Sequence, residues 1–210
     1  MALEDVYRAV MEFREDEIAG LVQAELEAGR PVSEVLNQGL IAAMDEWGRR
    51  FGAGEAFVPE LLMAAQTMKA GLEVLRPVLA AGDVEPQGTV VIGTVKGDLH
   101  DIGKNLVAMM LEGAGFRVLN LGVDVAPERF LEAASEAKAD IVCMSALLTT
   151  TMPQMETTVQ LIRERGLPFK TMVGGAPVTP EFAQRIGADG YSDDAPGAVA
   201  LARRLLGLAA

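Results

Sequence analysis

Apolar residues in the first eighty positions recur every three or four residues, as they do along one face of an α-helix. Four such stripes follow one another, separated by short polar or glycine-containing breaks. Their members are Leu3, Val6, Tyr7 and Val10; Ile18, Leu21, Val22 and Leu26; Val32, Val35, Leu36, Leu40, Met44, Trp47 and Phe51; and Val58, Leu61, Leu62, Ala65, Met68, Leu72, Leu75 and Leu79. The pattern predicts a four-helix bundle over residues 1–82.

The pattern changes after residue 82. Residues 83–88 are mostly polar and show no periodicity, so we expect a linker there. From residue 89 onward, short apolar runs alternate with segments of helix length. The runs cover residues 89–94, 116–119, 141–144, 169–173 and 190–191, and the helical segments cover 102–114, 126–137, 153–165, 179–186 and 195–206.

Five strand–helix units with apolar strands predict a parallel sheet that helices bury on both faces. The predicted fold class is therefore α/β: a helical bundle, then a five-stranded, flavodoxin-like (Rossmann-type) domain over residues 89–210. In such folds ligands bind at the carboxyl ends of the strands, near the point where the strand order reverses. The loops that directly follow the strands are the places to search for chemistry.

Composition narrows the classes of partner. The formal net charge is −12 and aromatic residues make up 5% of the chain, which disfavours nucleic acid and anionic membranes as partners. A single cysteine, Cys143, excludes an internal disulfide framework and fits a reducing compartment. No run approaches the roughly 20 apolar residues that span a bilayer, and the acidic N-terminus is unlike a secretory signal. We expect a cytoplasmic protein.

The loop after the first predicted strand contains the only histidine, in the sequence Asp98-x-His100-x-x-Gly103. Gly103 and the lysine after it suggest a nucleotide phosphate loop, but Asp98 stands where that motif has glycine, and Asn105 where it has Ser or Thr. Imidazole is a common metal ligand, and a carboxylate two residues away fixes its tautomer and raises its basicity. The plain alternative is a surface histidine near a helix N-terminus that Asp98 or Asp101 caps.

Two further strand ends carry suitable residues. The third strand runs into a hydroxyl-rich loop from Ser145 to Thr151, and the fourth ends in Gly174 and Gly175, which permit close backbone approach. Hydroxyl groups and paired glycines are also common in ordinary loops. Together they place a metal-ligand candidate, hydroxyl groups and uncovered backbone along one edge of one sheet.

These three motifs resemble the signature of cobalamin-binding domains that hold the cofactor with histidine on cobalt and its own base displaced. The chain has Asp-x-His-x-x-Gly, then after 41 residues Ser-x-Leu, then after 26 residues Gly-Gly. The first half is similar to the cap module that precedes this domain in methionine synthase and in corrinoid methyl-carrier proteins. Residues 51–61 carry that likeness, which extends over nearly the whole chain.

The resemblance implies a role for each matching residue. His100 would be the lower cobalt ligand, Asp98 would bond its imidazole, and Thr151, where methionine synthase has serine, would extend the relay. A second set would hold the displaced nucleotide tail: Gly103, Ser145, Leu147, Thr149, Gly174, Gly175, Tyr191 and Asp194. Four cap residues would cover the upper face of the corrin: Phe51, Phe57, Val58 and Leu61.

The implied activity is a methyl shuttle: cob(I)alamin takes a methyl group from a donor, and methylcobalamin gives it to tetrahydrofolate or a thiol coenzyme. Because the two modules account for 210 residues, we expect a carrier subunit rather than a stand-alone enzyme. Its partners would be a donor-specific methyltransferase, an acceptor methyltransferase and a reductive activator. Methanol, methylamines, glycine betaine and aryl methyl ethers remain open as donors.

Three other classes stay open at this point. A cobalamin-dependent sensor or regulator uses the same modules, usually with a DNA-binding module, whereas this sequence starts with an acidic bundle. The small subunit of an adenosylcobalamin mutase generally lacks the helical cap. A flavodoxin-like domain without cobalamin would leave the three spaced motifs unexplained.

Overall fold

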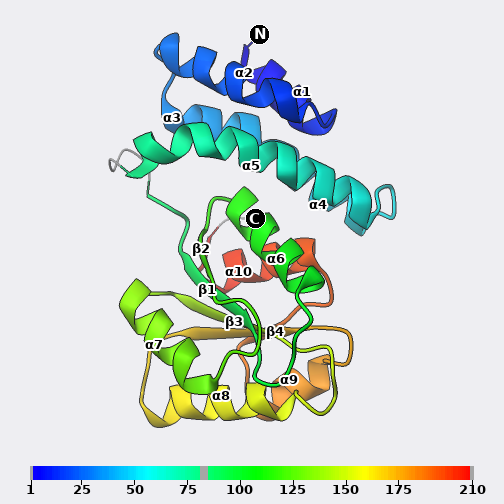
Figure 1. Ribbon diagram of the computed structural model, residues 1–210, viewed down its shortest axis with the longest axis vertical. Coiled ribbons are helices and arrows are strands. Elements are labelled where there is room, and N and C mark those ends of the chain that lie inside the picture. The colour runs from blue at the N-terminus through cyan, green and yellow to red at the C-terminus, as the bar shows by residue number, and fades with distance from the viewer. Residues whose placement is uncertain (1, 81–84, 209–210) are drawn as a thin grey trace. The chain divides into compact units, whose positions relative to one another are not determined.

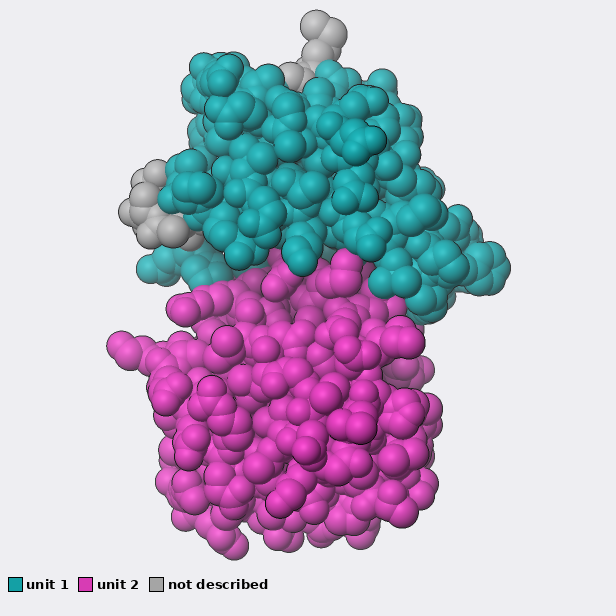
Figure 2. Space-filling view, viewed as in Figure 1, with its two compact units in different colours: residues 1–86, 113–115 teal, residues 87–112, 116–210 magenta. Residues whose placement is uncertain are grey.

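The computed structural model of the chain describes residues 2–80 and 85–208. It contains two compact units, one of residues 1–86 with Gly113–Gly115 and one of residues 87–112 with 116–210 (Figure 2). Residues 83 and 84 of the expected 83–88 linker lie outside the described residues. Within those residues, no helix is both long and apolar enough to cross a membrane.

The first unit is helical, as the apolar stripes predict. It contains α1 (Ala2–Met11), α2 (Glu15–Glu27), α3 (Val32–Glu34), the π-helix η1 (Val35–Ile41), α4 (Ala42–Gly52) and α5 (Val58–Ala80). Because α3, η1 and α4 follow one another without a break, they form the single helical segment predicted from the third stripe. Buried apolar side chains from each of the four segments, among them Val6, Ile18, Leu40 and Leu61, confirm the helical bundle.

The second unit is a parallel five-stranded sheet with a helix after each strand (Figure 1). The strands are β1 (Thr89–Thr94), β2 (Arg117–Asn120), β3 (Ile141–Ser145), β4 (Lys170–Gly174) and β5 (Gly190–Tyr191). The helices are α6 (Ile102–Gly113), α7 (Pro127–Ala137), α8 (Pro153–Glu164), α9 (Pro180–Ile186) and α10 (Ala195–Leu205). The order β2-β1-β3-β4-β5 confirms the flavodoxin-like prediction.

The apolar runs form strands because the helices packed on the sheet bury their side chains. Every residue of β1 is buried, and α6 and α10 cover one face of the sheet while α7 and α8 cover the other (Figure 1). The helices thus cover both faces, as predicted, but β2 is less buried than β1: none of its residues is buried, and Leu119 is 40% exposed. This strand lies at the edge of the sheet and has only one neighbouring strand.

Strand register brings three loops to one edge of the sheet. Thr94 pairs with Ser145, and Ser145 pairs with Gly174, so β1, β3 and β4 end at the same level. The helices that follow β1 and β3 lie on opposite faces of the sheet (Figure 1). The strand order therefore reverses between β1 and β3, at the position where such folds place their ligands.

Candidate functional site

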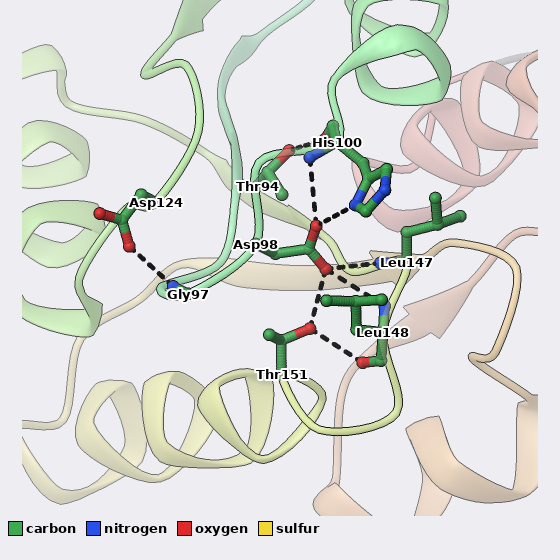
Figure 3. A network of polar contacts seen from close by, with 8 residues as sticks. All are labelled: Thr94, Gly97, Asp98, His100, Asp124, Leu147, Leu148 and Thr151. Atoms are coloured by element: carbon green, nitrogen blue, oxygen red, sulfur yellow. Dashed lines mark hydrogen bonds and ion pairs between the residues drawn. The ribbon is translucent and has the colours of Figure 1, made fainter.

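The loop between β1 and α6 places His100 against a buried carboxylate. The side chain of Asp98 is fully buried, and its Oδ1 lies 2.7 Å from Nδ1 of His100 (Figure 3). The backbone N–H of His100 donates to the same oxygen at 3.2 Å. Two donors of one residue thus converge on one carboxylate oxygen, which fixes the plane of the imidazole relative to the loop.

The other carboxylate oxygen of Asp98 binds the loop between β3 and α8. Oδ2 accepts the backbone N–H groups of Leu147 at 2.8 Å and Leu148 at 3.2 Å (Figure 3). The hydroxyl of Thr151 lies 2.8 Å from Oδ2 and 2.8 Å from the carbonyl oxygen of Leu148. Since a hydroxyl has one proton, it donates to one of these oxygens at a time.

These contacts set the charge of Asp98. Burial alone would raise its pKa, but hydrogen bonds from His100, the Leu147 amide and Thr151 outweigh burial and hold the pKa well below its usual range. The carboxylate is therefore ionised and can only accept hydrogen bonds. The proton between Asp98 and His100 consequently belongs to Nδ1, so that in the neutral form of the ring the lone pair is on Nε2.

The free nitrogen of His100 lies on an apolar, exposed surface. The His100 side chain is 52% exposed, and within the described residues its Nε2 has no hydrogen-bond partner. Four exposed apolar side chains come from the β1–α6 and β3–α8 segments: Leu99, Ile102 at the start of α6, Leu147 and Leu148. Clustered exposed apolar side chains mark a surface that a ligand or partner covers. An unpaired imidazole nitrogen beside such side chains could ligate a metal in a large, flat, mostly apolar group.

The paired glycines at the end of β4 lie against neighbouring backbone. A Cβ on Gly174 would lie 2.8 Å from the carbonyl oxygen of Ser192, and one on Gly175 would lie 2.0 Å from that of Ala146. Gly175 also has a φ of +124°, which L side chains rarely adopt. Both glycines are therefore required by the close approach of β3, β4 and the segment after β5, before any ligand is considered.

The remaining residues of the expected nucleotide site are spread along the same edge. Ser145 ends β3, Thr149 is exposed in the next loop, and Gly103 is the second residue of α6, with free space around it. Tyr191 is half-buried, and burial followed by the charge of Asp193 raises its pKa.

Asp194 already has a structural role. Its carboxylate accepts the Gly197 N–H at 2.7 Å and thereby caps the N-terminus of α10. Its expected contact with a nucleotide stays a prediction.

The four expected cap residues lie in the first unit. Phe57 is 69% exposed and Val58 is also exposed, whereas Phe51 is half-buried and Leu61 is fully buried. Their role above a corrin stays a prediction.

Besides the amides of Leu147 and Leu148, two contacts of the site are absent from the sequence prediction. The Thr94 hydroxyl donates to the carbonyl oxygen of His100 at 2.8 Å, and Asp124 contacts the backbone beside Asp98. A threonine at the end of a predicted strand was the available signal for the first contact. No motif pointed to the second, because it depends on β2 lying beside β1.

The depressed pKa of Asp98 predicts how stability depends on pH. Because the folded state lowers this pKa below the ordinary value of about 3.9, the stabilisation is complete above that value and is lost as the pH falls toward the folded pKa. We expect Asp98→Asn to lower the free energy of unfolding by about 1–3 kcal/mol at neutral pH. The deficit should shrink below about pH 4, where the wild-type carboxylate loses its advantage.

Urea unfolding of the full chain at a series of pH values measures this difference. Asp193→Asn is the matched control, because Asp193 is an exposed aspartate of the same unit. A deficit for Asp98→Asn that stays constant from neutral pH to about pH 3 would contradict the interpretation of this carboxylate.

The donor chemistry fits a cobalt corrinoid. One neutral imidazole with a carboxylate on its other nitrogen is a common metal-ligand arrangement. Because His100 supplies a single nitrogen, a metal held there takes its other ligands from elsewhere, and a corrin macrocycle brings four. The apolar side chains around His100 suit the face of such a ring.

Comparisons with known proteins identify the family of both halves of the chain. A family model described as a B12 binding domain matches residues 88–200, and a second model of that description matches residues 2–76. The trimethylamine corrinoid protein 2 of Methanosarcina mazei is 44% identical over 202 residues, which cover 94% of this chain and 93% of the relative. The dimethylamine corrinoid protein 2 of Methanosarcina acetivorans is 41% identical over 207 residues, with 97% and 95% coverage.

A solved structure extends the likeness to three dimensions. A chain in the crystal structure of the methanol:cobalamin methyltransferase complex from Methanosarcina barkeri matches with a TM-score of 0.87 and 30% identity. The match covers 98% of the present chain and 80% of that chain. The fold and site thus define a B12-binding protein with a helical module and an α/β module. The chain belongs to the family of corrinoid proteins with B12 binding domains.

Proposed function

We propose that the chain carries a methyl group on a cobalamin whose cobalt is bound by His100. The supporting observation is the ionised, buried Asp98, which holds Nδ1 of His100 at 2.7 Å and leaves Nε2 free on an exposed surface. The relatives support the class of reaction, since they are named trimethylamine and dimethylamine corrinoid proteins over almost the full length. When bound, cobalamin supplies a cobalt centre that accepts a methyl group and passes it on.

The protein's own residues hold the ligand nitrogen and its proton. Asp98 keeps the Nδ1 proton of His100 in place and so keeps the Nε2 lone pair available. Thr151 and the amides of Leu147 and Leu148 hold the second carboxylate oxygen, so that Asp98 cannot rotate away from the imidazole. Release of His100 from the metal would then couple to protonation of the Asp98–His100 pair.

Two other groups of residues complete the proposed binding site. The tail of the cofactor would lie beside Gly103, Ser145, Leu147 and Thr149, with Gly174, Gly175, Tyr191 and Asp194 further along the sheet edge. Phe51, Phe57, Val58 and Leu61 of the helical unit would exclude water from the reactive face. Phe57 and Val58, which are exposed, have the apolar side chains that this role needs.

The partners follow from the chemistry of a carrier. We propose a donor methyltransferase specific for a methylamine, an acceptor methyltransferase and a reductive activator that restores the reduced metal. The named relatives favour methylamines, and the solved neighbour in a methanol:cobalamin methyltransferase complex makes methanol the second donor to test.

Transfer of a labelled methyl group tests this function. The chain is loaded anaerobically with cobalamin, reduced, and mixed separately with methyltransferases specific for trimethylamine, dimethylamine, monomethylamine and methanol, each with its ¹⁴C-methyl substrate. We expect one of them to place about equimolar label on the protein. If every methyltransferase labels its own corrinoid protein but none labels this chain, methylamines and methanol are contradicted as donors. If methyltransferases for glycine betaine and aryl methyl ethers also fail, methyl transfer is contradicted, and retained cobalamin binding would then favour a regulatory role.

A further inference from the structure

The loop that follows β2 contacts the backbone that carries Asp98. Asp124 lies in this loop, and its Oδ1 accepts the N–H of Gly97 at 2.7 Å (Figure 3). The N–H of Asp124 donates to the carbonyl oxygen of Asp98 at 3.0 Å. One residue therefore exchanges two hydrogen bonds with two consecutive residues of the His100 loop.

Asp124 has an uncommon backbone conformation. Its φ is +54°, and among the described residues only two others that are not glycine, Phe13 and Lys138, have a positive φ. This region costs about 1–2 kcal/mol for most side chains, and Asp and Asn tolerate it best. The surrounding structure holds Asp124 in the conformation in which both its amide and its carboxylate face residues 97 and 98.

The β2–α7 loop is itself fixed to β1. The N–H of Thr94 donates to the Gly122 carbonyl at 3.0 Å, the N–H of Val125 donates to the Thr94 carbonyl at 3.0 Å, and Val95 forms a parallel bridge with Val125. The His100 loop is thus bound on two sides. The β3–α8 loop holds the Asp98 carboxylate, and the β2–α7 loop holds the backbone from which that carboxylate extends (Figure 3).

We propose that Asp124 is a positioning residue for His100, an inference that rests on the proposed function of His100 as a metal ligand. Gly97 is exposed and has a φ of +82°, so without the Asp124 carboxylate this part of the loop has a free amide and a flexible residue directly before Asp98. Shifts of about 0.5 Å are enough to spoil a binding geometry. Asp124 keeps Asp98 where its Oδ1 accepts the Nδ1 proton, and thereby keeps Nε2 unprotonated.

Two substitutions of Asp124 separate the effect of its side-chain hydrogen bond from the effect of its backbone conformation. Asp124→Asn keeps an oxygen acceptor and tolerates a positive φ, whereas Asp124→Gly tolerates the conformation but has no acceptor. Both remove the same charge. Lys138→Gly is the control for a glycine at a positive φ elsewhere in the unit, since Lys138 is exposed and has a φ of +51°.

The state of the His100 ring can be measured in the protein without cofactor. Because the chain contains a single histidine, every ring signal from ¹⁵N-labelled histidine comes from His100. Long-range ¹H–¹⁵N NMR of ¹⁵N-histidine-labelled protein in alkaline buffer, where the ring is neutral, reports the ratio of Nδ1–H to Nε2–H tautomer directly. We expect Asp124→Gly to lower this ratio by roughly two- to tenfold, the range for loss of one hydrogen bond. Asp124→Asn and Lys138→Gly should keep the wild-type ratio.

The tautomer ratio and cobalamin binding together distinguish the positioning role of Asp124 from the proposed function. An unchanged ratio in Asp124→Gly, with or without a lower melting temperature, would overturn the positioning role, and so would a wild-type ring without the Nδ1–H tautomer. If Asp124→Gly shifts the ratio but the wild-type chain binds no cobalamin, the positioning role of Asp124 stands and the proposed function is refuted instead.

Discussion

Replacing His100 by alanine is expected to abolish nitrogen ligation of the cobalt by the protein and to lower its affinity for cobalamin by about 10- to 100-fold. In the proposed site the imidazole supplies the protein's bond to the metal through its exposed Nε2, so this substitution would remove that bond itself. The fold should remain, because the side chain is 52% exposed and Asp98 keeps its backbone donors. Equilibrium dialysis and visible spectra of the loaded proteins measure both effects.

His100→Gln separates the loss of the metal ligand from the loss of the hydrogen bond to Asp98. The glutamine amide can donate to Asp98 as the imidazole does, but it is a poor ligand for the metal. We therefore expect His100→Gln to be as defective as His100→Ala in binding cobalamin while unfolding at the wild-type urea concentration. Wild-type affinity and spectra in both variants would contradict the role of His100.

Replacing Gly175 by alanine is expected to destabilise the α/β unit by roughly 2–5 kcal/mol. The added Cβ would lie 2.0 Å from the Ala146 carbonyl oxygen, and a φ of +124° adds backbone strain. Relief requires β3 and β4 to separate at their carboxyl ends, where the Ala146 N–H donates to the Gly174 carbonyl at 3.2 Å. That movement would draw the Leu147 amide away from Asp98, so cobalamin binding should fall as well.

Gly166→Ala is the matched control for this substitution. Gly166 has a φ of +61°, but a Cβ there would meet nothing within 4 Å, so only the conformational cost of about 1–2 kcal/mol applies. Urea unfolding of both variants gives the comparison. A loss for Gly175→Ala no larger than that for Gly166→Ala would show that the strand ends are less tightly packed than the structure indicates.

The apolar pattern predicted most of the fold because burial of apolar side chains determines where the strands and helices form. β1 and β5 have the predicted bounds, and the predicted run 141–144 differs from β3 by one residue, since each is a short apolar segment between turn residues. The exposure of β2 did not follow from the pattern. An apolar run does not show whether its strand lies inside the sheet or at the edge, and β2 lies at the edge.

The site was predictable only where side chains carry the chemistry. Asp98 and His100 lie two residues apart, so their contact follows from local geometry and residue type. The amides of Leu147 and Leu148 are available whatever the side chain, and no residue pattern marks them as donors. Asp124 reaches Gly97 because the sheet places the β2 loop beside the β1 loop, a pairing of residues 27 positions apart.

The cobalt(II) electron paramagnetic resonance spectrum tests the central proposal most directly. The wild-type chain is reconstituted anaerobically with cobalamin whose benzimidazole carries ¹⁵N, so that nitrogen from the protein and nitrogen from the cofactor give different splittings. If His100 is the lower ligand, the spectrum will show coupling to one unlabelled nitrogen, and His100→Ala will lose it. Coupling to the labelled benzimidazole in the wild-type chain, or the same unlabelled coupling in His100→Ala, would contradict it.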